Sequence, residues 1–340
     1  MFPPALLSGG GYERLRAMAG RLPIGVIDQQ FGFEFALCRE AARADFCVFP
    51  VRGSALAAHY IREGKAAPAG SAAAALGACL ARQAGDPASF LSRKEGAVVL
   101  EYDVPDVLPE EPAPPGIFFV PGNPSEGAAR GLHDDPAATV AALWAAAGWC
   151  ADAAELRQVE RVCEALSGTS HVGQAGVMPG RQRAVRLVVH RIDAAELPGL
   201  LERLRWPGSS AAAMSVVRDT SDLTRPGAVL SLDVTACGIS PRLGLELFRP
   251  VEWSRIDRAG WLPVIDRLAD KAWCLPAKAE GLRAWPRSTR LIGPGGVYRI
   301  HRTINHIKVV VAQGRIVAKA YAAMVVRPPR ELTAVWQTEE

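Results

Sequence analysis

The stretch that decides the fold is INHIKVVVAQGRIVAKAYAAMVV, residues 304–326, near the C-terminal end of the sequence. Two runs rich in β-branched residues flank the short segment Ala312-Gln313-Gly314-Arg315. Glycine adopts the positive φ angles that tight turns require, and a glycine-containing turn between two such runs is typical of a β-hairpin. We therefore predict an antiparallel hairpin here.

Four polar side chains interrupt the apolar character of this hairpin. His306 and Lys308 lie on its first strand, and Lys319 and Tyr321 lie on its second strand. Side chains two residues apart on a strand point to the same face, so a suitable register would bring all four together. Their shared face is either exposed to water, as in an open sheet where lysine prevents edge pairing, or it binds a ligand.

The composition predicts a soluble globular protein. The chain has 340 residues, of which 49% are hydrophobic, and this suffices to build one large domain or two ordinary ones. It carries 39 Lys and Arg against 35 Asp and Glu, a net charge of +4, and these charges are interspersed along the sequence. We therefore expect no nucleic acid as a partner.

The cysteines and the N-terminus predict a cytoplasmic location. The seven cysteines are scattered and none forms a Cys-x-x-Cys pair, so we expect reduced thiols and no structural zinc. The first residues lack the basic start and the long apolar run of a signal peptide. No run of about 18 apolar residues could cross a membrane, so we expect no membrane association.

Other motifs favour structural roles over metal or phosphate binding. The histidines at 171, 190, 301 and 306 lie on separate segments without a short His-x-His pattern, so we expect no metal site. Gly293-Pro294-Gly295-Gly296 lacks the Lys-Ser/Thr of a P-loop and predicts a turn. His133-Asp134-Asp135 precedes Pro136 and predicts the N-terminus of a helix.

From residue 96 onward, a pair of strands followed by two helices recurs along the sequence. The N-terminal part is less regular, with a helix at 12–19, a strand pair at 32–37 and 46–51 that could open the series, and a helix at 71–83. A recurring unit of this length is typical of a repeated architecture. The predicted units are strands 97–104 and 116–121 with helices 135–149 and 152–166, strands 170–178 and 184–192 with helices 194–206 and 210–218, strands 228–236 and 242–249 with helices 254–272 and 277–285, and the hairpin at 304–326.

The strands have one apolar and one polar side. In 228–236, leucine and valine at 230, 232 and 234 alternate with Ser231, Asp233 and Thr235. Helices should cover the apolar side, and tandem hairpins with every helix on one face can close into a barrel. We predict an α+β fold of repeated α-β-β-α units that form an antiparallel β-barrel with helices outside and a polar lumen. Residues 1–95 would be an N-terminal segment that could hold a first repeat, 96–326 the barrel, and 327–340 a tail.

This succession of units resembles the ABBA prenyltransferases, in which ten antiparallel strands enclose a reaction chamber inside a ring of helices. The resemblance covers about residues 96–326 and rests on topology and on Lys319-Ala320-Tyr321. This tripeptide matches the Lys-x-Tyr pattern that holds the allylic diphosphate in the fungal indole branch. Lys308 and Arg186 lie on other predicted strands where the family has such anchors. The resemblance implies a PT-barrel in which these residues bind a diphosphate.

Allylic diphosphates ionise to a carbocation and a diphosphate, so fixed Lys and Arg charges can stabilise the leaving group without a metal. We expect no cofactor beyond this co-substrate and no need for Mg²⁺. A carboxylate beside the acceptor can take its proton. Glu101, Asp233 and Glu246 are candidates, and the resemblance favours Glu101. Alternatively, Asp233 and Glu246 form ion pairs with Arg186 or Lys308 on neighbouring strands inside the barrel.

Two functions follow from these patterns. In the first, the protein is a prenyltransferase of natural-product biosynthesis that acts on an aromatic or peptide acceptor. Glu101 and Asp233 would be catalytic, and Glu246 and His306 would join the diphosphate anchors in binding substrates. In the second, the protein is a non-catalytic barrel that binds a peptide or partner protein and presents it to a partner biosynthetic enzyme. A closed lumen with clustered Lys, Arg and aromatic side chains would favour the first function, and a flat, exposed sheet would favour the second.

Overall fold

The structure is a computed structural model of the chain. It describes residues 2–22, 30–51, 53–85, 97–110, 113–120, 135–249, 256–293 and 296–327. Our expectations for 133–134, 254–255 and 294–295, and for most of the tail, concern residues outside these ranges.

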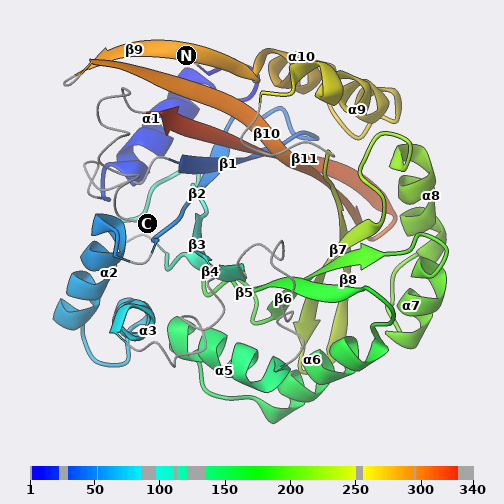
Figure 1. Cartoon of the computed structure of the whole chain (residues 1–340), viewed down its shortest axis with the longest axis horizontal. Coiled ribbons are helices and arrows are strands. Elements are labelled where there is room, and N and C mark those ends of the chain that lie inside the picture. Colours follow the sequence, from blue (N-terminus) through cyan, green and yellow to red (C-terminus); the bar gives the residue numbers. More distant parts are fainter. Residues whose placement is uncertain are drawn as a thin grey trace.

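In the described part of the chain, eleven strands form one antiparallel sheet, and ten of them close into a barrel (Figure 1). The ring runs β11-β1-β2-β3-β4-β5-β6-β7-β8-β10, and pairing between β10 and β11 completes it. β9 pairs with β10 outside the ring. The strands are β1 Gln30–Ala36, β2 Ala44–Val48, β3 Ala97–Tyr102, β4 Gly116–Val120, β5 His171–Val177, β6 Val185–Ile192, β7 Ala228–Thr235, β8 Gly238–Leu247, β9 Arg287–Gly293, β10 Gly296–Ala312 and β11 Arg315–Arg327.

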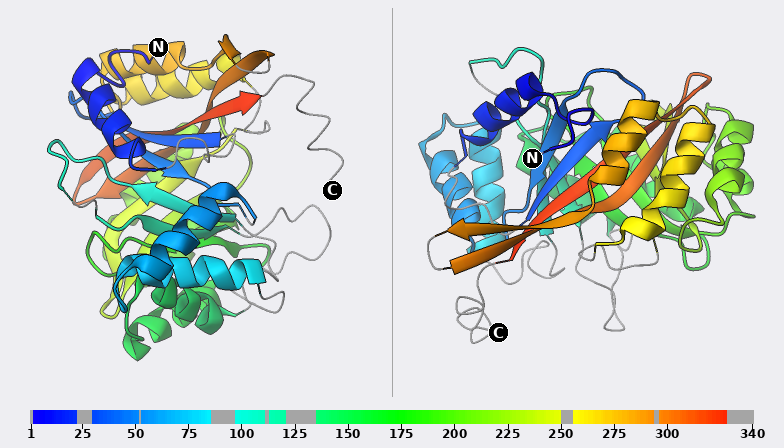
Figure 2. Two further views of the ribbon diagram at one scale, coloured as in Figure 1. Left: turned by 90° about the vertical axis from the view of Figure 1, so that its left-hand side faces the viewer. Right: turned by 90° about the horizontal axis from the view of Figure 1, so that it is seen from above.

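The helices surround the barrel on its outer side, as Figures 1 and 2 show from three directions. Several begin where the sequence supplies a capping side chain, because Asp135, Asp152 and Ser209 each accept a hydrogen bond from a backbone N–H of the first turn. The helices are α1 Gly9–Ala19, α2 Ala55–Ala66, α3 Ala72–Gly85, α5 Pro136–Ala147, α6 Ala153–Ala165, α7 Leu197–Arg203, α8 Ser210–Thr220, α9 Arg258–Asp270 and α10 Pro276–Ala284.

The strand alternation separates a hydrophobic core from a polar lumen. Leu230, Leu232 and Val234 on β7 are fully buried in the layer between barrel and helices. Asp233, on the same strand, lines a cavity inside the barrel. Burial of the outward-facing apolar side chains on the strands of the ring stabilises the closed sheet at about 25 cal/mol per Å² of apolar surface. The predicted fold class is confirmed, and the architecture is that of a PT-barrel.

Strands from opposite ends of the sequence meet where the barrel closes. β1, from the N-terminal segment, lies between β11 and β2. Its register places Glu34 opposite Tyr321 and Ala36 opposite Lys319. Residues 30–48 therefore contribute two strands to the ring.

Three elements differ from the sequence prediction. Helix α2 was not predicted, and β10 begins at Gly296, eight residues before the expected hairpin. Strand β9 was also missed, because six of its seven residues are exposed and it has no apolar side that alternation could reveal. The β9–β10 extension projects beyond the ring at one end of the barrel (Figure 1).

Candidate active site

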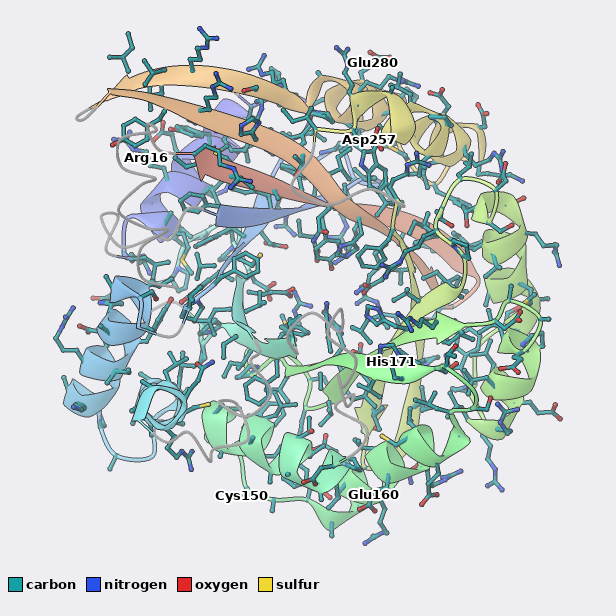
Figure 3. All side chains as sticks on the ribbon, in the orientation of Figure 1. Arg16, Cys150, Glu160, His171, Asp257 and Glu280 are labelled. Carbon is teal, nitrogen blue, oxygen red and sulfur yellow. The ribbon has the colours of Figure 1, made fainter. Side chains whose placement is uncertain are left out.

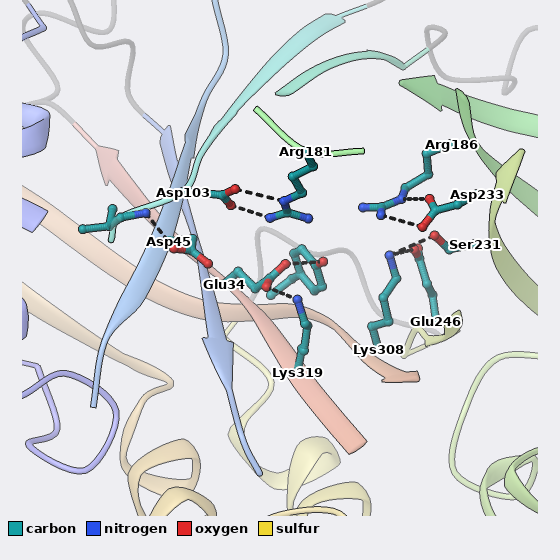
Figure 4. A network of polar contacts seen from close by, with 12 residues as sticks. Glu34, Asp45, Asp103, Arg181, Arg186, Ser231, Asp233, Glu246, Lys308 and Lys319 are labelled. Atoms are coloured by element: carbon teal, nitrogen blue, oxygen red, sulfur yellow. Dashed lines mark hydrogen bonds and ion pairs between the residues drawn. The ribbon is translucent and has the colours of Figure 1, made fainter. Parts of the chain in front are cut away.

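The site lies inside the barrel, where the strands direct their polar side chains toward one another. Figure 3 shows strand side chains filling the interior, whereas Cys150, Glu160 and Glu280 lie at the periphery. The register of the hairpin places His306 opposite Tyr321 and Lys308 opposite Lys319, so all four residues share one face as predicted. The polar network of the lumen is drawn in Figure 4.

Lys308 is held between two neighbouring strands. Its Nζ donates to Glu246 Oε1 at 2.8 Å, and a second hydrogen bond of 3.1 Å reaches Ser231 Oγ. Both members of the ion pair are more than nine-tenths buried. Burial raises the pKa of Glu246, but the charge of Lys308 outweighs it and holds the pKa at about 2. Glu246 therefore stays ionised and fixes the ammonium group in place.

Arg186 and Asp233 form a second pair. The register of β6 and β7 sets them opposite each other, and two parallel hydrogen bonds of 2.7 and 3.1 Å join the guanidinium to the carboxylate. Burial raises the pKa of Asp233, but Arg186 outweighs burial and lowers it overall. The alternative that Asp233 and Glu246 pair with basic residues of neighbouring strands is thus the arrangement found.

Glu34 joins the two motif residues, and the sequence analysis missed it. Its Oε1 accepts from Lys319 Nζ, and its Oε2 accepts from the Tyr321 hydroxyl at 2.5 Å. Burial raises the pKa of Glu34, but Lys319 and Tyr321 together hold it at about 2. The only signal was the alternation in GFEFAL, residues 32–37, where a single glutamate interrupts an apolar strand.

A row of aromatic side chains forms one wall of the lumen, and we refer to its members, Tyr321, His306, Phe248 and His190, as the ring row. His306 stacks on Tyr321, with the two ring centroids 4.3 Å apart. His306 also stacks with Phe248, at a centroid distance of 4.8 Å. His190 follows at 6.2 Å from Phe248. Burial lowers the pKa of both histidines to about 4, so the rings are neutral near pH 7. Among the described residues, His306 Nδ1 and His190 Nε2 are buried without a hydrogen-bond partner.

Carboxylates gather in another part of the lumen. The side-chain carboxylate of Glu101 makes no hydrogen bond or ion pair with a described residue. Burial and then the Glu34 charge raise the pKa of Glu101. Burial likewise raises the pKa of Asp45 to about 6, although Asp45 accepts a hydrogen bond from the Val104 N–H. Asp103 is instead paired through two hydrogen bonds with Arg181.

Two cavities open among these groups, and Tyr321 lines both. One, of about 490 Å³ including space open to solvent, is bordered by Glu34, Asp45, Cys47 and Glu101. The other, of about 280 Å³ on the same measure, is lined by the basic residues Arg186, Arg242, Lys308 and Lys319. Arg242, on β8, was not singled out from the sequence, and it has no ion pair within the described part of the chain. Basic side chains therefore predominate in the smaller cavity, which Asp233 also lines, and carboxylates predominate in the larger one, which Arg181 also lines.

Neither a metal centre nor a membrane helix is found in the described residues. No group of three or more His, Cys, Asp or Glu side chains there is arranged to hold a metal ion. Over the same ranges, no helix has both the length and the apolar character that a bilayer crossing requires.

The chain is similar to solved structures of the prenyltransferase PriB. The apo form is 16% identical with a TM-score of 0.46, and the match covers 95% of this chain and 91% of that chain. The ternary complex with L-tryptophan and dimethylallyl thiolodiphosphate is 15% identical with a TM-score of 0.48, covering 96% and 94%. The binary complex with product diphosphate is 16% identical with a TM-score of 0.46, covering 96% and 94%. No family model matches the chain, and no curated protein matches it. Because the identities and TM-scores are low, we base the site on this chain's own side chains.

Proposed function

We propose that the protein transfers a prenyl group from an allylic diphosphate to an aromatic or peptide acceptor inside the barrel. The observation that carries the proposal is the convergence of Arg186, Arg242, Lys308 and Lys319 on one cavity beside Tyr321. Arg186, Lys308 and Lys319 each hold one carboxylate, and Arg242 has none among the described residues, so an added anion would meet one unpaired cation beside three paired ones. A charge that is removed from water without a partner is costly, so an anion here would be favourable. A lumen of this kind, closed and lined with basic and aromatic groups, favours the transferase over an exposed binding sheet.

The basic cavity supplies what ionisation of the diphosphate needs. As the allylic C–O bond breaks, the electron pair stays with the diphosphate, whose charge rises in the transition state. Lysine ammonium groups have three donors each, so Lys308 and Lys319 retain N–H groups after binding their carboxylates. Arg242, which has no carboxylate partner among the described residues, is the cation best placed to respond to an added anion. These basic side chains would stabilise the negative charge of the leaving diphosphate in place of a metal ion, so Mg²⁺ would not be required.

The ring row would face the allylic cation. Tyr321 lines both cavities and is stacked on neutral His306, so its ring stands between the basic and the acidic compartments. The negative π face of an aromatic ring attracts a cation without reacting with it. Phe248 extends this wall. The unpartnered Nδ1 of His306 offers a further contact for a bound molecule.

Glu101 is the carboxylate that fits proton removal from the acceptor. The acceptor atom attacks the allylic cation to form the new bond, and the proton it then loses passes to a base. Glu101 lines the larger cavity, is not bound to a cation of the described chain, and has a raised pKa. Asp233 is bound at both oxygens to Arg186, so we assign it to orienting that guanidinium.

A second function, that of a non-catalytic barrel which binds a peptide, is favoured by the ion pairs themselves. Lys308, Lys319 and Arg186 each already hold a carboxylate, and a diphosphate must compete with these partners. An extended peptide with basic side chains could instead enter the acidic cavity beside Glu101 and Asp45.

Calorimetric titration with dimethylallyl and geranyl diphosphates, with and without Mg²⁺, tests the proposal. We expect micromolar binding that does not depend on Mg²⁺. Arg242→Gln should weaken binding about tenfold or more, since hydrogen bonds to charged groups contribute about 1.5–3 kcal/mol. The matched control is Arg315→Gln at the exposed hairpin turn, which removes the same charge outside the lumen.

Incubation with tryptophan and with peptides that contain aromatic residues, followed by mass spectrometry, then tests transfer. Prenylated product supports the proposal. If the folded protein binds neither diphosphate and forms no product, prenyl transfer is ruled out; peptide binding under those conditions would support the second function.

A further inference from the structure

Three arginines stand side by side on three adjacent strands beyond the barrel. In the β9–β10–β11 extension, Arg290 is directly opposite Arg299, and Arg299 is directly opposite Arg327. Residues paired in this way point to the same face of the sheet, with neighbouring strands about 4.8 Å apart. Like charges directly opposite one another destabilise a sheet. We refer to Arg290, Arg299 and Arg327 as the arginine row.

The arginine row has no acidic partner among the described residues. None of its members forms an ion pair there, and all three are exposed. From 281 to 330 the sequence contains eight Arg and two Lys but no Asp or Glu. The next residue on this face, His301, has a pKa lowered by partial burial and by the charges of Arg327 and Arg299. The positive charge of this extension is therefore left without a partner from its own strands.

Protection of a sheet edge does not account for Arg299, the middle member of the row. Charged residues that prevent unwanted pairing act when they lie on the edge strand itself. Arg299 lies on β10, which at this level is paired with β9 on one side and with β11 on the other. Edge protection also fails to explain the neighbouring apolar side chains, because Leu291, Ile292 and Val297 are 54%, 86% and 48% exposed. Ile292 and Val297 lie directly opposite each other on the arginine face, whereas Leu291 is on the other face. Exposed apolar side chains next to unpaired positive charge are typical of an interaction surface.

The open edge of β9 indicates what kind of partner fits. Within the described part of the chain, β9 pairs only with β10, so its other edge presents unpaired backbone N–H and C=O groups. A peptide that pairs with this edge would extend the row by one position, next to Arg290. We propose that the β9 edge and the arginine row bind an extended acidic peptide by strand addition, with its carboxylates on the arginine face and apolar residues over Leu291 on the other face.

The arginine row is on the same face of the sheet as the side chains that line the lumen. Arg327 and Tyr321 are on the same face of β11, six residues apart, which corresponds to about 20 Å along the strand. A peptide on the outer edge of β9 lies three strand spacings from β11, so it would be about 25 Å, or roughly seven extended residues, away from Tyr321. Peptide binding at β9 does not rest on the proposed prenyl transfer, and either can fail without the other.

The test is fluorescence anisotropy with the full chain and the labelled peptide Ser-Val-Glu-Val-Glu-Val-Glu-Val, in which Glu and Val alternate as on a strand. We expect saturable binding that weakens with salt, because exposed charges are screened. The double variant Arg290→Glu with Arg299→Glu should weaken binding about tenfold or more, since two exposed charge contacts become repulsive. Arg315→Glu, at the opposite end of the β10–β11 hairpin, is the control and should leave affinity unchanged.

Four further probes separate strand addition from general attraction of anions. The same peptide with alternate backbone amides N-methylated should lose most of its affinity, because it can no longer pair with the β9 edge. A peptide with Gln in place of Glu should also bind weakly. Equal affinity for the N-methylated peptide, equal loss in the Arg315→Glu control, or tighter binding to single-stranded RNA or to phosphatidylserine vesicles than to the peptide would each overturn the proposal.

Discussion

Glu34→Gln is the substitution whose outcome the structure specifies most fully. Glu34 lies on β1 and holds two side chains of β11, Lys319 and Tyr321, at the pairing that closes the barrel. Its side chain is 15% exposed, and that of Lys319 is 20% exposed. Glutamine keeps the shape of the side chain but removes its charge. The ammonium of Lys319 is then left largely buried without a counter-ion, a situation that costs about 3–5 kcal/mol in comparable buried pairs.

The pKa of Glu34 gives an independent magnitude. The pKa falls from 4.5 to about 2 on folding, and each pKa unit corresponds to about 1.4 kcal/mol. The carboxylate thus contributes about 3 kcal/mol to the free energy of unfolding at neutral pH. Because the folded pKa lies below the unfolded one, this contribution is present above pH 4.5 and is lost as the pH falls toward 2. Glutamine does not titrate, so in the Glu34→Gln variant residue 34 should make no pH-dependent contribution to the free energy of unfolding between pH 4.5 and 2.

Urea unfolding at pH 7 and at pH 3 measures both effects. We expect Glu34→Gln to be about 3 kcal/mol less stable than the parent chain at pH 7, with a smaller difference at pH 3. The double variant Glu34→Gln with Lys319→Gln should recover part of the loss, because it removes the unpaired charge. Glu280→Gln, in an exposed ion pair with Arg283, is the control and should change stability by less than about 1 kcal/mol. A loss at pH 7 no larger than that of the control would refute the reasoning.

Three other predictions follow from the site and from the arginine row. Glu101→Gln should lower the rate of prenyl transfer about 100-fold or more while calorimetry shows diphosphate binding unchanged; an unaltered rate would exclude Glu101 as the base. The pKa of His306 falls from 6.5 to about 4 on folding, so the unfolded chain binds more protons in this window, and stability should be full above pH 6.5 and decrease by about 3 kcal/mol as the pH falls to 4. Denaturation at several pH values across this range should give a smaller slope of the free energy of unfolding against pH for His306→Gln than for the parent chain. The remaining slope would come from His190, and an unchanged slope would contradict the assignment to His306. Arg299→Thr should raise the free energy of unfolding by about 0.2–1 kcal/mol at low salt, a gain that high salt removes and that Arg315→Thr does not reproduce; a loss of stability would show that the row is not repulsive.

The carboxylates of the lumen show what the alternation of residues along a strand can and cannot predict. Asp233 and Glu246 could be assigned to the lumen from the sequence, because each interrupts an alternating apolar strand. Their partners Arg186 and Lys308 could be named only as alternatives, since the choice depends on which strands are neighbours and in which register. Glu34 is a largely buried and paired carboxylate like these two, but its strand lies in the N-terminal segment, where no recurring sequence pattern predicted a strand of the barrel.

The sequence by itself determined the α+β barrel, the side of each strand that faces the lumen, and the gathering of His306, Lys308, Lys319 and Tyr321. These follow from residue alternation and from one tight turn, which act over a few residues. Only the tertiary structure decided that Glu34 binds Lys319, because 285 residues separate them and barrel closure alone brings β1 beside β11. The same holds for the arginine row, since its alignment depends on the register of three strands. A side chain's face is a local property of the chain, whereas the neighbour it meets across a sheet is a property of the closed fold.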